Sequence, residues 1–121
     1  MFSNMFSNQD FIQSLYDSFN RREIETVLSM IAEDVKWANG MEGGFIYGRD
    51  NVNEYWRRQF EVFNPQLEIL KSETDENGRI IVTVHQVVKD LEGNLLAERT
   101  VEQIFTVEND LIKIYEIGET K

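Results

Sequence analysis

The first half of the chain repeats its apolar residues at helical spacing. From Asp10 onward this spacing predicts a first helix with one apolar face, formed by Phe11, Ile12, Leu15, Tyr16 and Phe19. A second, shorter stripe predicts a helix that packs on the first as a hairpin, with Ile24, Val27, Leu28 and Ile31 inside. A third helix is expected to be capped by Asp50 or Asn51 and to stop at Asn64-Pro65. Its buried face would hold Val52, Tyr55, Trp56, Phe60 and Phe63.

Between the second and third helices, residues 35–39 predict a short strand that enters a glycine-rich loop over residues 40–48. From residue 67 the apolar period changes to two, which predicts four strands: 67–73, 79–90, 95–107 and 111–117. Turn dipeptides that tolerate a positive φ separate them: Asn77-Gly78, Glu92-Gly93 and Asn109-Asp110. The pattern predicts an α+β domain in which helices cover one face of an antiparallel meander.

The turns also predict which strand residues face each other. A three-residue loop with Gly93 in the left-handed conformation places His85 opposite Arg99, and a two-residue turn at Asn109-Asp110 places Gln103 opposite Glu116. The inward face would then carry His85, Val87, Arg99, Val101, Gln103, Phe105, Ile114 and Glu116. The outward face would carry Val82, Val84, Val88, Ile104, Tyr115 and Ile117. So much outward apolar surface predicts a homodimer through this face.

Length and composition narrow the classes of function. The 121 residues suffice for one domain, expected over residues 9–121 after a flexible segment at residues 1–8. With no Cys and a single His, no metal site is expected, and no cofactor fingerprint is present. The net charge of -10 argues against nucleic acid or an anionic membrane as a partner. Without a signal-peptide pattern or an apolar run of membrane length, a cytoplasmic location is expected.

Three stretches of the chain carry a resemblance to a known group of proteins: Phe11 through Arg22, Ala32 through Trp37, and Tyr47-Gly48-Arg49-Asp50-Asn51-Val52 through Trp56. With the order of elements, they resemble the nuclear transport factor 2-like superfamily, above all its SnoaL-like and ketosteroid isomerase-like branches. The resemblance covers about residues 9–119. It implies a cone-shaped, strongly curved antiparallel sheet wrapped around N-terminal helices, as in cystatin-like folds. It also implies a pocket at the open end and frequent dimerisation through the outer sheet face.

The catalytic residues of ketosteroid isomerases do not carry over to this chain. That reaction needs a carboxylate base, together with a tyrosine and a protonated aspartic acid that hold the enolate oxygen. Ungapped matching places the base on Asn39, the tyrosine on Leu15, next to Tyr16, and the aspartic acid on Gln103. A steroid isomerase is therefore not expected, although Gln103 can donate a hydrogen bond to a carbonyl.

The inward face still offers candidates for proton transfer. His85 is the natural acid or base, because its unperturbed pKa lies nearest neutrality, unless it is structural. Arg99 would bind a substrate carboxylate or oxyanion, or else form a buried ion pair with Glu116, which would otherwise orient the other two. Residues expected to bind substrate are Tyr16, Trp37, Asn39, Tyr55, Trp56, Gln103 and Phe105. For the aromatic members a core role is the competing interpretation, and for Asn39 a surface-loop role.

Two functions follow from these observations. The first is a SnoaL-like pocket protein for an apolar, oxygenated small molecule, acting as a proton-transfer enzyme such as an isomerase, cyclase or dehydratase. The alternative is a non-catalytic dimeric ligand-binding or adaptor domain. An open pocket with an unpaired His85 would favour the enzyme, and a filled cone the alternative.

Overall fold

The computed structural model describes residues 8–120 of the chain, so residues 1–7 of the segment expected to be flexible lie outside the described part. Three helices are present in this part: α1 (Asn8–Asn20), α2 (Ile24–Leu28) and α3 (Arg49–Phe60). The strands are β1 (Ile31–Ala38), β2 (Phe45–Tyr47), β3 (Phe63–Thr74), β4 (Ile80–Asp90), β5 (Leu95–Glu108) and β6 (Leu111–Thr120). No helix in the described range is long and apolar enough to cross a membrane.

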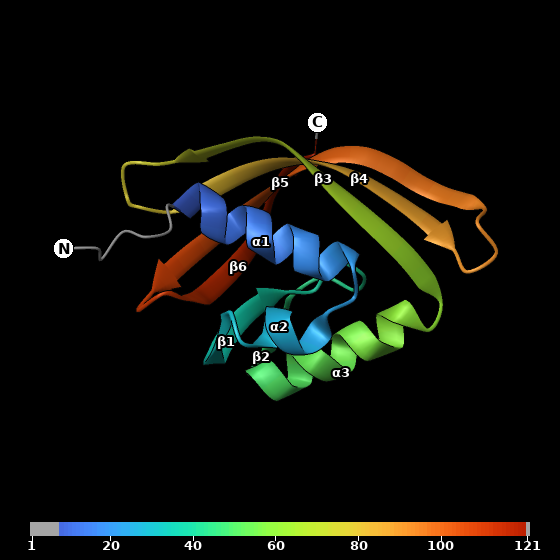
Figure 1. The fold of residues 1–121 in the computed structure, drawn as a ribbon, viewed down its shortest axis with the longest axis horizontal. Coiled ribbons are helices and arrows are strands. Elements are labelled where there is room, and N and C mark those ends of the chain that lie inside the picture. Colours follow the sequence, from blue (N-terminus) through green and yellow to red (C-terminus); the bar gives the residue numbers. More distant parts are fainter. Residues whose placement is uncertain (1–7, 121) are drawn as a thin grey trace.

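The strands form one curved, unclosed sheet in the order β2-β1-β6-β5-β4-β3. Strands β3 to β6 make the predicted antiparallel meander, while β1 runs parallel to β6 and antiparallel to β2. The long strands arch over α1, and α2 and α3 lie below α1 in the view of Figure 1. This arrangement confirms the predicted α+β class with a curved sheet around the helices.

The core lies between the concave face of the sheet and the helices. Helix α1 buries Ile12, Leu15 and Tyr16, and α3 buries Tyr55 and Trp56, all at the predicted helical spacing. They pack in one cluster with the buried valines of β4 and with Phe105 and Tyr115. The helical half of the sequence pattern therefore predicted the correct faces.

Several element boundaries differ from the prediction. Ile31, expected in the second helix, is the first residue of β1, and Phe63, expected in the third helix, is the first residue of β3. Residues 45–47, expected within a loop, form β2. Gly48 precedes α3 with a φ of 91°, its N–H binds the carbonyl of Val35 at 2.8 Å, and no side chain caps the helix. The predicted cap on Asp50 or Asn51 was wrong, because Gly48 turns the chain directly from β2 into α3.

An extra residue in β5 changes the register that the β4–β5 turn predicted. Gly93 has the expected positive φ of 93°, and Lys89 lies opposite Leu95 as the turn requires. Val88, however, lies opposite Ala97, so Leu96 is an extra residue in the strand. Beyond this β-bulge every partner on β4 moves by one. Arg99 consequently faces Gln86 instead of His85.

The β5–β6 turn shows the same effect. Asn109 and Asp110 both have a positive φ, as predicted, but Lys113 is an extra residue in β6. Phe105 is therefore opposite Tyr115, and Glu116 moves to the outer face opposite Ile104. The predicted inward residues of β5 are confirmed. The predicted inward residues of β4 and β6 were wrong, because each bulge reverses which side chains face inward beyond it. These residues are His85, Val87, Ile114 and Glu116.

The outer apolar patch that predicted a homodimer is not formed. Val82, Val84 and Tyr115 are buried in the core, and Val88 and Ile117 line an internal cavity. Of the six residues, Ile104 alone remains on the convex face. The homodimer stays a prediction that rests on the family resemblance.

We expect the bulged register to show in a matched pair of isosteric substitutions. Val84→Thr places a hydroxyl at a fully buried site of the concave face and should lower the free energy of unfolding by about 1–3 kcal/mol. Thr83→Val, one residue earlier on the convex face, should change it by less than about 0.5 kcal/mol. Urea unfolding measures both values. A larger loss for Thr83→Val than for Val84→Thr would contradict this register.

Candidate functional site

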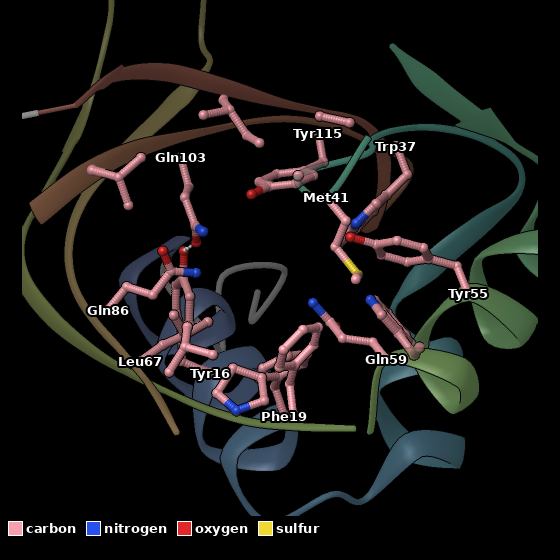
Figure 2. Close-up of a pocket in the computed structure, with 18 of the residues that line it drawn as sticks. Tyr16, Phe19, Trp37, Met41, Tyr55, Gln59, Leu67, Gln86, Gln103 and Tyr115 are labelled. Carbon is pink, nitrogen blue, oxygen red and sulfur yellow. Dashed lines mark hydrogen bonds between the residues drawn. The ribbon is translucent and has the colours of Figure 1, made fainter. Parts of the chain in front are cut away.

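A cavity of about 470 Å³ lies between the concave face of the sheet, α1 and α3. Aromatic and aliphatic side chains form most of its wall, and Figure 2 shows them surrounding the open space. Three of the lining residues are large apolar side chains that remain 42–51% exposed: Met41, Leu96 and Ile117. The cavity therefore opens to solvent through an apolar mouth.

A hydrogen bond between α1 and β5 crosses the inner part of the cavity. The hydroxyl of Tyr16 donates to Oε1 of Gln103, and both side chains are buried. Burial, with a smaller effect from Tyr115, raises the pKa of Tyr16 well above 10.0, so its phenol stays neutral. Because Oε1 accepts from Tyr16, the amide N–H groups of Gln103 are left to donate to a ligand.

Five aromatic rings make a continuous wall. Trp37 from β1 meets Trp56 from α3 edge to face, with centroids 5.2 Å apart. The ring centroid of Trp37 is also 4.4 Å from that of Tyr115, and the centroid of Tyr115 is 5.2 Å from that of Phe105. Tyr16 meets Phe105 edge on at 6.2 Å. Rings in these mutual orientations hold each other in place, which leaves a preformed apolar surface for a flat molecule.

Two more polar groups on this wall face the cavity. The hydroxyl of Tyr115 and the indole nitrogen of Trp37 point into the open space in Figure 2. Neither makes a hydrogen bond to any residue that the structure describes. Burial raises the pKa of the Tyr115 phenol, with a further contribution from Tyr55, so this hydroxyl is also a neutral donor. A ligand oxygen could thus receive hydrogen bonds from several sides.

Tyr55 connects α3 to the mouth of the cavity. Burial raises the pKa of its phenol, an effect that backbone N–H groups of Gly40 and Met41 partly oppose by donating to the hydroxyl oxygen. Asn39 stabilises the same turn, because its Oδ1 accepts the backbone N–H groups of Met41 and Glu42 at 3.0 Å. The contact between Tyr55 and this turn places Met41 beside the opening.

The structure brings most of the predicted substrate-binding residues together. The cavity is lined by Tyr16, Trp37, Tyr55, Trp56, Gln103 and Phe105, and also by Arg99. Asn39 is not part of the lining and has the surface-loop position of the competing interpretation. Tyr16, rather than the matched Leu15, reaches Gln103.

The expected proton-transfer group is not assembled. His85 lies on the convex face, where its Nε2 is 2.7 Å from Oε2 of Glu98 and its Nδ1 is 3.9 Å from Oε1 of Glu68. Glu116 also lies outside, 3.8 Å from Arg79. Their inward placement was wrong because the bulges at Leu96 and Lys113 turn both side chains outward.

Sequence reasoning missed two amides that line the cavity, Gln59 and Gln86. Gln59 lies four residues after Tyr55 and three after Trp56, so helical periodicity alone places it on the same face of α3. Gln86 follows from the register only once the bulge is known. The register that the turn alone predicts places Gln86 on the outward face.

The lining carries little charge. None of the described residues that line the cavity is Asp, Glu, His or Lys, and Arg99 is the single charged one among them. Within residues 8–120 no group of three or more His, Cys, Asp or Glu side chains could hold a metal ion. The described cavity therefore offers neutral hydrogen-bond donors at its inner part and one guanidinium near its mouth.

A model of the SnoaL-like domain matches residues 12–115, nearly the whole chain. The protein belongs to the SnoaL-like family. Solved structures with the same fold place this SnoaL-like chain in the nuclear transport factor 2-like superfamily, as the resemblance implied. No curated protein matches it closely enough to count as a relative.

Three similar structures illustrate the fold. A nuclear transport factor 2-like protein of unknown function from Burkholderia pseudomallei is 25% identical, with a TM-score of 0.80 over 93% of this chain and 91% of that one. TerC, co-crystallised with polyporic acid, is 24% identical, with a TM-score of 0.78 over 92% and 89%. A putative polyketide cyclase from Xanthomonas campestris is 22% identical, with a TM-score of 0.74 over 90% and 87%.

The two phenols on the cavity wall should differ in their contribution to stability. Tyr16→Phe leaves the buried Oε1 of Gln103 without its donor and should cost about 1–3 kcal/mol of unfolding free energy. Tyr115→Phe removes a hydroxyl with no partner among the described residues and should cost less than about 1 kcal/mol. Denaturant unfolding at pH 7 tests the difference, and equal losses would contradict the hydrogen bond.

The buried phenols also predict a loss of stability in alkali. Below pH 10 the phenols are neutral in the folded and in the unfolded chain. Above pH 10 the unfolded chain releases phenol protons, whereas the folded chain retains those of Tyr16, Tyr55 and Tyr115. The free energy of unfolding should therefore fall as the pH rises above 10. In Tyr115→Phe the fall should be shallower by roughly 1 kcal/mol per pH unit. Urea unfolding between pH 9 and 11 measures the slopes, and an unchanged slope would contradict this burial.

Proposed function

We propose that this SnoaL-like protein binds a flat, apolar or aromatic small molecule that carries an oxygen function. The observation that supports this most directly is the combination of an open cavity of about 470 Å³ with hydrogen-bond donors on an otherwise apolar wall. Small-molecule sites in proteins have this composition: mostly apolar lining with a few convergent polar groups. The volume lies within the range of about 300–1,000 Å³ that is usual for such sites.

The arrangement of the wall suggests how the molecule lies. Its apolar body would pack against Trp37, Trp56 and Tyr115, which already hold one another in place. Its oxygen would accept a hydrogen bond from the amide of Gln103, which Tyr16 orients. Preformed rings and an oriented amide reduce the entropy lost on binding, because few side chains must be fixed.

The cavity supports binding better than proton transfer. An isomerase, cyclase or dehydratase must remove a proton, which requires a base within hydrogen-bond reach of the substrate. The residue matched to the base of ketosteroid isomerases, Asn39, has no useful basicity, and His85 lies on the other side of the sheet. None of the described lining residues is a carboxylate or a histidine.

A small-molecule enzyme is the second candidate, favoured by the Tyr16–Gln103 pair. The amide of Gln103, which Tyr16 orients, could donate to a substrate oxygen that develops negative charge. Several proteins of the same fold are described as enzymes, among them a putative polyketide cyclase and an epoxide hydrolase from Mycobacterium tuberculosis. The fate of a bound ligand separates the candidates, since a binding protein returns it unchanged.

We expect neutral flat aromatic ketones and polyporic acid to bind in the cavity. The choice of polyporic acid follows from the TerC structure. Binding should quench the fluorescence of Trp37 and Trp56 and raise the melting temperature through mass action. In Ala97→Phe an added ring occupies part of the cavity, so the affinity should fall at least tenfold, which is about 1.4 kcal/mol.

Thr100→Phe provides the matched control, because it adds the same ring on the convex face, opposite His85. Its affinity should equal that of the unmutated protein. Ligand recovered unchanged after hours of incubation supports the binding function, and conversion to a product supports the enzyme. If no probe binds, or if both variants bind as the unmutated protein does, the proposal fails.

A further inference from the structure

Arg99 is the one guanidinium among the described residues of the cavity wall, and none of the described residues is its partner. Its side chain is exposed and lines the cavity from β5. Among residues 8–120 it makes no hydrogen bond and no ion pair. Glu116, the carboxylate that the sequence offered as its partner, lies on the convex face 3.8 Å from Arg79. The ion-pair interpretation of Arg99 is thereby removed, and the carboxylate-binding interpretation is left.

The surroundings of Arg99 favour an anion. The nearest cross-strand residue is Gln86, which also lines the cavity and has no hydrogen-bond partner in the described part of the chain. Met41, Leu96 and Ile117 add apolar surface around the mouth, and Glu42 and Arg58 lie next to it, outside the cavity lining. Low-dielectric walls strengthen the field of a single charge, and the described lining holds no carboxylate to cancel it. Arg99 is thus the one positive charge on the described cavity wall of a chain whose net charge is -10.

A second polar group lies on the same face of the same strand. Gln103 follows Arg99 by four residues, so their Cα atoms are about 13 Å apart along β5. Gln103 is buried and neutral, whereas Arg99 is exposed to water. Burying an ionised group costs much free energy, whereas placing it at a water-exposed mouth costs little. The two ends of the cavity therefore suit different groups of one ligand.

We propose that the natural ligand is an elongated aromatic or apolar anion. Its carboxylate, or another acidic oxygen group, binds the guanidinium of Arg99 at the mouth, and a neutral oxygen at the other end accepts from Gln103. This inference rests on the proposed binding function and adds the charge and length of the ligand. The planar guanidinium matches a carboxylate through two parallel hydrogen bonds, which gives orientation as well as affinity.

A pair of ligands that differ only in charge tests the inference. The probes are 4′-hydroxybiphenyl-4-carboxylate and 4′-hydroxybiphenyl-4-carboxamide, titrated against the same protein at low and at moderate salt. The carboxylate should bind the unmutated protein at least tenfold more tightly, and salt should reduce this preference through screening. Arg99→Gln should abolish the preference, because binding of the carboxylate should weaken to the level of the carboxamide. Arg99→Lys keeps the positive charge but lacks the two parallel N–H donors of the guanidinium, so it should retain part of the preference for the carboxylate.

Arg57→Gln is the matched control, because it removes one positive charge from an exposed position on α3 that does not line the cavity. It should keep the full preference for the carboxylate. Equal binding of both probes, or an equal loss in Arg57→Gln and Arg99→Gln, would overturn the inference while the binding function stands. If neither probe binds any of the proteins, the proposed function itself is contradicted. The melting temperature of each variant confirms that it is folded.

Discussion

The chemistry of the cavity depends on two extra residues in the sheet. Side chains alternate between the faces of a strand, so one extra residue reverses every position beyond it. Leu96 in β5 and Lys113 in β6 are these residues. They turn Val84 and Tyr115 toward the helices and carry His85 to solvent. The apolar character of the wall and the absence of a described base from it thus have the same structural origin.

The sequence could predict the fold because its signals are local and redundant. Helical and strand periods differ clearly, and residues 93, 109 and 110 have the positive φ that their turns require. A bulge has no comparable residue preference, and Leu96 and Lys113 are ordinary strand residues. Comparison of the two faces of β4 would have helped, since Val82, Val84 and Val88 form the more apolar set. Burial of that set outweighs the register that the turn alone implies.

The residues of the candidate site show the same difference between helices and strands. Residues placed by helical spacing, such as Tyr55 and Trp56, were predicted correctly because α3 has no irregularity within it. Gln103 was expected on the inward face from the turns as well as from the family resemblance, and β5 keeps its predicted face. His85 and Glu116 depended on the registers of β4 and β6, and both were misplaced. Side chains on strands beyond a bulge cannot be assigned to a cavity without the pairing of the whole sheet.

The amide of Gln103 has a consequence for the way the cavity responds to its surroundings. Where a carboxylic acid donates a hydrogen bond in a buried site, it does so only while it holds its proton, so donation depends on the environment that keeps its pKa high. An amide has no proton to lose over the same range. Gln103, with the neutral phenol of Tyr16 behind it, donates at any physiological acidity. This part of the wall offers a permanent dipole, whose recognition of an oxygen atom needs no tuning by neighbouring charges.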